Sequence, residues 1–215
     1  MKGLPLSLAL LLGLLFGPQW VSAQKKVTAT ENIPKTPLQW NFSYLGEMGV
    51  HPGLKVGIER QFTGFKTTKT KYRKAKVVRI KERTRVFFWT LNAGSYFHRN
   101  NNLGILLNGE IGYRKIRNQG LKTEAMLGIG YIHNFWPGAT YLVETDGSVS
   151  TRNLTSNGGF TTHFSLGFGR DLTFIKNRKW AWHFRPTIMW QLPYNTGILA
   201  RFFTEIGITY RFSKA

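Results

Sequence analysis

A histidine, a serine and an aspartate lie within one short stretch of the chain and could carry out chemistry. His163 and Ser165 are two residues apart, so they share one face of a β-strand, and Asp171 follows further along that face. A serine hydroxyl activated by an imidazole, which a carboxylate orients, is the arrangement used in acyl transfer. These residues are therefore candidate catalytic groups, and the alternative is that they are structural side chains packed inside the fold.

The N-terminus is typical of an exported protein. Lys2 precedes a short apolar run over 4–16, and small residues lead to Ala23. This pattern predicts a signal peptide at 1–23, and the run is too short to span a bilayer as a helix. We expect a flexible leader at 24–37 and a single domain at 38–215.

Apolar and polar residues alternate in several segments after the leader. Over 180–192, for example, Trp182, Phe184 and Ile188 share a face opposite His183 and Arg185. Alternation with a period of two predicts strands with one apolar and one polar face, and no later run is long enough for a membrane helix. Turn residues divide the chain into eight predicted strands at 38–50, 54–65, 85–98, 104–116, 121–135, 159–174, 179–192 and 198–212.

With this pattern the chain resembles the small eight-stranded outer-membrane β-barrels of Gram-negative bacteria, the OmpA-transmembrane-domain and OmpX family. Ile208, Tyr210 and Phe212 resemble the C-terminal signal that the outer-membrane assembly machinery reads, although 213–215 follow that phenylalanine. The resemblance implies an all-β fold, a single antiparallel up-and-down transmembrane β-barrel of about eight strands, located in the outer membrane. A soluble exported β-sandwich or lipocalin-like barrel is the alternative.

The polar faces of these strands would point into the barrel and carry charges of both signs. An eight-stranded barrel has an interior just wide enough for side chains to fill, so we expect a plugged, charge-paired interior. A narrow polar pore for water or ions is the alternative. The predicted interior charge network consists of Glu47, Lys55, Glu59, Glu110, Arg114, Lys122, Glu124, His183, Arg185, Arg201 and Glu205.

The formal net charge is +20, and the chain contains no cysteine. The lack of cysteine excludes thiol chemistry and zinc–thiolate sites. A strongly basic exported chain favours anionic lipids over nucleic acid as its partner, here lipopolysaccharide or phospholipid headgroups. No phosphate-binding loop or metal-ligand spacing stands out, since histidines such as His51 and His98 are scattered, so we expect no cofactor and no metal.

The densest positive charge lies at 66–84, which we predict to be a periplasmic link facing the same side as both termini. Such a link is long for a periplasmic turn, so either it forms a hairpin that extends past the membrane or the strand count errs by a pair. It would be an anion- or headgroup-binding patch or simply a solvated link. The patch residues are Lys66, Lys69, Lys71, Arg73, Lys74, Lys76, Arg79, Lys81, Arg83 and Arg85.

Three function classes follow. The first is a non-enzymatic structural or interaction barrel, or an accessory subunit of an envelope complex. The second is the narrow pore. The third is a lipid A-modifying acyl hydrolase, because His163 and Ser165 resemble the His-x-Ser element of the outer-membrane lipid A deacylases, although no Arg precedes this His and no Asn follows this Ser.

Overall fold

The computed structural model describes residues 26–34, 37–73, 76–99, 102–136, 138, 140–152, 155–173, 179–194 and 197–212. The predicted signal peptide and Lys74 lie outside these residues. No helix in the described part is long and apolar enough to cross a membrane. The strands are β1 (Lys26–Asn32), β2 (Gln39–Glu47), β3 (Gly53–Arg73), β4 (Lys76–His98), β5 (Asn102–Arg117), β6 (Leu121–Trp136), β7 (Thr140–Val143), β8 (Val149–Arg152), β9 (Thr155–Asp171), β10 (Trp180–Tyr194) and β11 (Gly197–Arg211).

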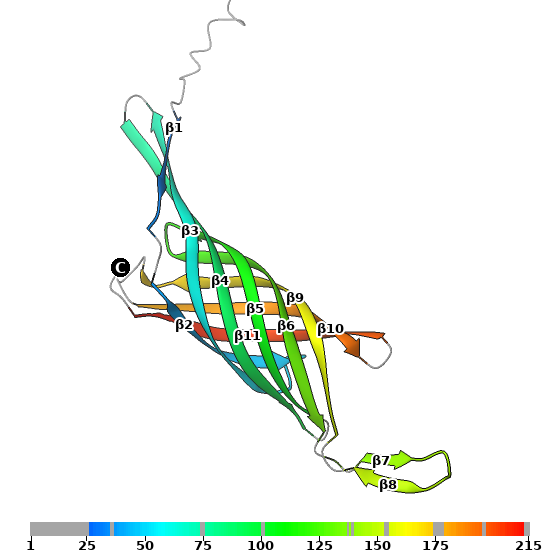
Figure 1. Cartoon of the computed structure of the whole chain (residues 1–215). Helices are drawn as coiled ribbons and strands as arrows, with labels where there is room; N and C mark the ends of the chain where they lie inside the picture. Colours follow the sequence, from blue (N-terminus) through cyan, green and yellow to red (C-terminus); the bar gives the residue numbers. More distant parts are fainter. Residues whose placement is uncertain are drawn as a thin grey trace, which may run out of the picture.

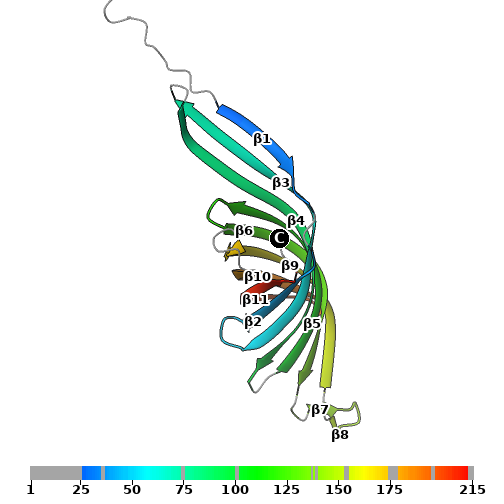
Figure 2. The same cartoon turned by 90° about the vertical axis from the view of Figure 1, so that its left-hand side faces the viewer.

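Eight of the strands close into a ring in which every neighbouring pair is antiparallel. The order is β3-β2-β11-β10-β9-β6-β5-β4, and pairing of β4 with β3 closes the ring. Figures 1 and 2 show the tilted strands wrapping around one barrel. The predicted all-β, up-and-down barrel of about eight strands is therefore confirmed, and each predicted strand corresponds to one member of the ring.

The two faces of each ring strand differ as the alternation predicts. On β5, Leu107 and Ile111 are 59% and 64% exposed, whereas Asn108 and Glu110 between them are buried. Other ring strands repeat this pattern, so apolar side chains form a band around the outside and polar side chains fill the inside. This is the partition of a transmembrane β-barrel, and it is the reverse of a soluble domain.

Residues 66–73 and 76–84 of the predicted link continue β3 and β4 as one long hairpin. The ladder runs without a change of partner strand from the barrel to the pair Arg73 and Lys76. The hairpin extends about 25 Å beyond the end of the barrel interior, given a rise of about 3.3 Å per residue in a strand. Of the two explanations for its length, the extending hairpin is correct, and the count of eight ring strands stands.

Residues 26–32, expected to belong to a flexible leader, instead form β1. This strand pairs with 65–71 of β3, on the same edge of β3 that β2 occupies at 54–59. Between the two, the Ile33 amide donates to the Gly64 carbonyl, after which Pro34 has no amide hydrogen to offer. The long β3 supplies the edge that orders β1, and the three strands form an extension that projects from the barrel (Figure 2).

The segment between β6 and β9 contains a separate hairpin of β7 and β8, at the barrel end opposite the extension (Figure 1). Its turn contains Gly147 with a φ of 83°. The amide and hydroxyl of Ser148 donate to Asp146 Oδ1, and these two bonds lower the pKa of that carboxyl. The turn is therefore closed by its own side chains.

Candidate functional site

A cluster of buried ion pairs occupies the middle of the barrel, and we call it the central cluster. It joins four carboxylates to four cations, so its formal charge is balanced when its histidines are neutral. Lys122 Nζ, for example, lies 3.1 Å from Glu124 Oε1. Its charged members are Glu59, Glu110, Glu124, Glu205, Lys55, Arg114, Lys122 and Arg185, its histidines are His163 and His183, and all are buried.

Two arginines link the carboxylates of the central cluster. Arg114 donates from both terminal nitrogens to Glu59, at 2.6 and 2.7 Å, and from Nε to Glu124 at 2.5 Å. Arg185 donates from Nε to Glu124 at 3.0 Å and from Nη1 to Glu205 at 3.2 Å. Paired donors of this kind fix the geometry of each carboxylate as well as its charge.

A lysine and two histidines complete the cluster. Lys55 Nζ lies 2.6 Å from Glu205 and 3.6 Å from Glu110. Nε2 of His163 lies 2.9 Å from Glu110, and Nε2 of His183 lies 2.9 Å from Glu205. The cluster therefore joins strands β3, β5, β6, β9, β10 and β11 across the interior.

Space for these long side chains comes from inward-facing glycines. A Cβ at Gly128 would lie 2.2 Å from His163 Nε2 and 2.8 Å from Glu110 Cγ. Any larger residue at this position would displace the imidazole and the carboxylate that it contacts. The glycine is thus part of the central cluster, although it carries no polar group.

Smaller ion pairs lie on either side of the central cluster. At the end near β7 and β8, Arg201 Nη1 donates to Glu47 Oε1 and lies near Tyr96 Oη, both at 2.6 Å. At the other end, Asp171 accepts hydrogen bonds from Arg211 and Thr173. Every predicted member of the interior network is buried, and Asp171 with Arg211 adds a pair that the sequence analysis did not assign to it.

The three candidate catalytic residues do not form a triad among the described contacts. His163 bonds to Glu110, and Ser165 Oγ lies 2.7 Å from Thr187 Oγ1. Asp171 is instead held by Arg211 near the end of the barrel. His163 and Ser165 are also buried inside the ring, whereas the resemblance to lipid A deacylases would require a site that faces lipid.

The two faces of the β1–β3–β4 extension differ sharply in charge. Among the described residues of the extension, one face carries cations and no acidic residue. Glu31 and Glu82 both lie on the opposite face, where Lys66 pairs with Glu82 at 3.1 Å. The cationic face holds a groove of about 370 Å³ between threonine and basic side chains. Of the predicted patch residues, Lys69, Lys71, Arg79, Lys81, Arg83 and Arg85 line it, together with Thr28, Thr67 and Thr70.

This cationic surface continues the outer surface of the barrel. On β4, Arg83 and Arg85 point to the same side as Phe87 and Trp89, because the four positions alternate with buried ones. On β5, Lys115 and Arg117 pair directly with Arg85 and Arg83. We call the six groove-lining cations together with Lys115 and Arg117 the basic face, which begins where the apolar band ends.

The predicted assembly signal lies on the outside of the last strand, beside the seam between β11 and β2. Ile208 and Phe212 are exposed. The ring centroid of Tyr210 lies 4.5 Å from that of Trp180 and 5.3 Å from that of Phe212, and Trp40 of β2 lies 6.3 Å from Phe212. An aromatic group therefore marks the closing seam at the same end of the barrel as the extension.

Taken together, the closed ring, the apolar band and the polar interior define a small transmembrane β-barrel. No protein-family model matches the chain, and no curated protein sequence matches it. Among solved structures, the N-terminal β-barrel domain of Pseudomonas aeruginosa OprF is similar at 9% identity, over 85% of this chain and 100% of that chain, with a TM-score of 0.43. Neisserial surface protein A is similar at 8% identity, over 86% and 99%, with a TM-score of 0.45. Both belong to the class that the sequence predicts, but at these values the fold rests on the strand pairing described above.

Proposed function

We propose that this protein is a non-enzymatic barrel of the bacterial outer membrane, with a sealed interior, that binds anionic phospholipid headgroups through its basic face. In this role it is a structural or interaction component of the envelope. The observation that carries the proposal is the position of the basic face, directly beside the apolar band and free of acidic residues.

The pairing of charges inside the ring supports a sealed interior. The long side chains of the central cluster meet across the barrel, and smaller ion pairs lie toward both ends. The charged side chains of the described interior pair with one another, unlike the charged rings that line selective pores. The interior therefore supports a structural role more than a conducting one.

The outer surface supports a lipid role. A barrel in a bilayer presents apolar residues to the acyl chains and aromatic residues near the interface, and the next layer outward is the headgroup region. Phe87 and Trp89 lie at the edge of the apolar band, and Arg83 and Arg85 precede them on β4, toward the extension. Phosphates of the headgroups would meet the basic face at this level, each nearby cation contributing about 1 kcal/mol.

The end of the barrel that carries the extension also carries the start of β2 and the end of β11, since Gln39 pairs with both Glu59 and Arg211. We infer that this end faces the periplasm, as both termini do in the orientation expected for such barrels. The headgroups within reach are then the phospholipids of the inner leaflet, not lipopolysaccharide of the outer leaflet.

The lipid proposal predicts a charge-dependent enrichment of anionic lipid. The mature chain is placed in bilayer discs of phosphatidylcholine with added phosphatidylglycerol, and the retained lipid is measured by native mass spectrometry. The double variant Lys69→Gln/Lys81→Gln removes one cross-strand pair of the basic face. It should weaken retention of phosphatidylglycerol by about 2 kcal/mol, or roughly 30-fold.

The matched control is Lys66→Gln/Arg99→Gln, which removes the same charge from the opposite face of the hairpin and from the other end of the barrel. It should retain phosphatidylglycerol as the parent does. Equal loss in the two double variants would mean that net charge alone attracts the lipid. Equal retention by parent and Lys69→Gln/Lys81→Gln would end the proposal.

The orientation can be tested separately because the chain has no cysteine of its own. Val149→Cys places a thiol in the β7–β8 hairpin, and Lys81→Cys places one on the extension. In intact cells a maleimide that does not cross the outer membrane should label Val149→Cys, and Lys81→Cys should react only after the membrane is permeabilised. Labelling of Lys81→Cys alone in intact cells would reverse the orientation and move the basic face to the outer leaflet.

A further inference from the structure

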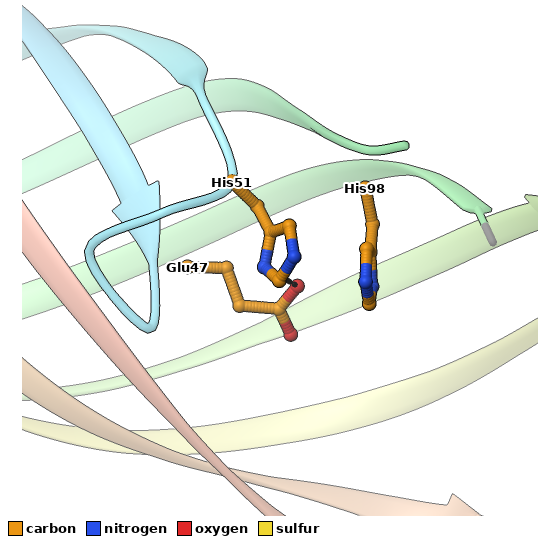
Figure 3. Close-up of side chains that lie close together, drawn as sticks. All are labelled: Glu47, His51 and His98. Atoms are coloured by element: carbon orange, nitrogen blue, oxygen red, sulfur yellow. Dashed lines mark ion pairs between the residues drawn. The ribbon is translucent and has the colours of Figure 1, made fainter. Parts of the chain in front are cut away.

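A carboxylate and two imidazoles meet at the barrel end opposite the basic face. Glu47 ends β2, His51 lies in the following turn, and His98 ends β4 (Figure 3). One ligand atom from each of the three side chains lies within 4.8 Å of the other two. Glu47 is buried, and the two histidines are partly accessible, so a small ion could reach the group from outside.

The backbone brings these three residues together. Glu47 and His51 exchange backbone hydrogen bonds of 3.1 and 3.0 Å across the turn, in which Met48 and Gly49 have φ values of 54° and 75°. The Phe97 amide then donates to the Pro52 carbonyl at 2.8 Å, which fixes the turn against the end of β4. The position of the side chains is thus set by the fold.

The donor atoms are arranged for a shared ligand. His51 Nδ1 is buried, lies 3.9 Å from Glu47 Oε2, and has no hydrogen-bond partner among the described residues. The rings of His51 and His98 have centroids 3.6 Å apart at an interplanar angle of 39°. Two imidazoles packed this closely can offer nitrogen donors to one metal ion.

An outer layer of hydrogen bonds orients the carboxylate. Arg201 Nη1 holds Glu47 Oε1 at 2.6 Å, which leaves Oε2 directed toward His51. Arg201 in turn lies 2.6 Å from Tyr96 Oη, and that hydroxyl donates to Asn134 at 2.7 Å. Metal-binding carboxylates are commonly fixed by partners of this kind.

We propose that Glu47, His51 and His98 bind a divalent transition-metal ion of the Zn²⁺ type, with water at the remaining position. Two nitrogen donors and one carboxylate oxygen suit Zn²⁺ and disfavour Mg²⁺ or Ca²⁺, which prefer oxygen ligands. The ion links the β2–β3 turn to the end of β4. The spacing along the chain predicts no metal site, because the third ligand is remote from the first two.

The test measures Zn²⁺ binding to the mature chain folded in detergent micelles, by isothermal titration calorimetry. The parent should bind one Zn²⁺, and His51→Ala and His98→Ala should each weaken binding by at least the roughly 10–100-fold that follows loss of an outer-layer partner. His133→Ala is the matched control, because His133 lies on β6 outside the group and should leave the affinity unchanged. The midpoint temperature of thermal unfolding, measured in parallel, should rise on addition of Zn²⁺ for the parent and for His133→Ala, and should not rise for His51→Ala or His98→Ala.

Circular dichroism without metal establishes that each variant is folded, so loss of binding cannot arise from a missing barrel. Failure of the parent to bind Zn²⁺ would overturn the proposal. So would an equal loss of affinity in His133→Ala, because binding would then come from surface histidines in general. Retention of full affinity by both His51→Ala and His98→Ala would have the same meaning.

Discussion

Replacing Arg114 with methionine should lower the free energy of unfolding of the barrel by about 3–5 kcal/mol, because it leaves a buried carboxylate without its cation. Arg114 makes both close contacts of Glu59, whose next cation is Arg185 at 3.9 Å. Glu124 is less affected, since Lys122 and Arg185 still contact it. The loss of stability therefore arises mainly from burying the Glu59 carboxylate without a close cation, and less from the lost contact itself.

The double variant Arg114→Met/Glu59→Gln restores the charge balance and serves as the control. It should recover much of the lost stability, because a neutral amide costs far less than a carboxylate in the same place. Urea unfolding from phosphatidylcholine vesicles, followed by tryptophan fluorescence, measures both. An Arg114→Met barrel as stable as the parent would show that the central cluster has no structural role, and conductance recordings of the same variant test whether the interior has opened.

Replacing Ile129 with arginine should cost about 2–4 kcal/mol when the barrel unfolds from a bilayer, as expected for a cation at the membrane midplane. Ile129 lies at the middle of β6 and is 71% exposed. In water such a substitution at an exposed position would have little effect. The free-energy cost of Ile129→Arg therefore shows whether lipid or water surrounds the outer face of the barrel.

Val149→Arg is the matched control for this substitution. Val149 is 61% exposed but lies on β8, outside the ring. Its replacement should change the unfolding free energy in vesicles by less than about 0.5 kcal/mol. If Ile129→Arg and Val149→Arg are equally mild, the apolar band does not face lipid and a soluble barrel becomes the better description.

The ring was predictable from the sequence because each of its strands has one apolar and one polar face. The same two-residue period assigned the interior residues. Once the apolar face of a strand is taken to point outward, the alternate residues must point inward. The alternation of exposed Leu107 and Ile111 with buried Asn108 and Glu110 on β5 is an example that the structure reproduces residue by residue. The alternation is strong because each strand has apolar surroundings on its outer face and a polar interior on its inner face.

The extension was not predictable by the same rule. Polar and charged residues such as Lys69, Thr70 and Lys81 occupy both faces of 66–73 and 76–84, so this segment carries no apolar alternation. Without that hairpin there is no edge for β1, and its strand could not be predicted either. Asp171 was assigned to a candidate triad because sequence spacing does not reveal that Arg211, from another strand, lies beside it.

The grouping of Glu47, His51 and His98 was also out of reach of the sequence. The first two residues lie in one turn, but His98 is brought to them by the pairing of β3 with β4. Register over a long hairpin decides whether such residues meet, and a shift by one position would place His98 on the other face. Spacing along the chain therefore carried no signal for this group.

The last strand has a consequence for how the barrel closes. From β11, Arg201 supplies the cation for Glu47, Glu205 supplies one carboxylate of the central cluster, and Arg211 supplies the cation for Asp171. A sheet without β11 would hold a surplus cation at its centre and an unmatched carboxylate near each rim. Ring closure and neutralisation of the interior are thus a single event, and a partly assembled sheet is penalised electrostatically until its final strand arrives.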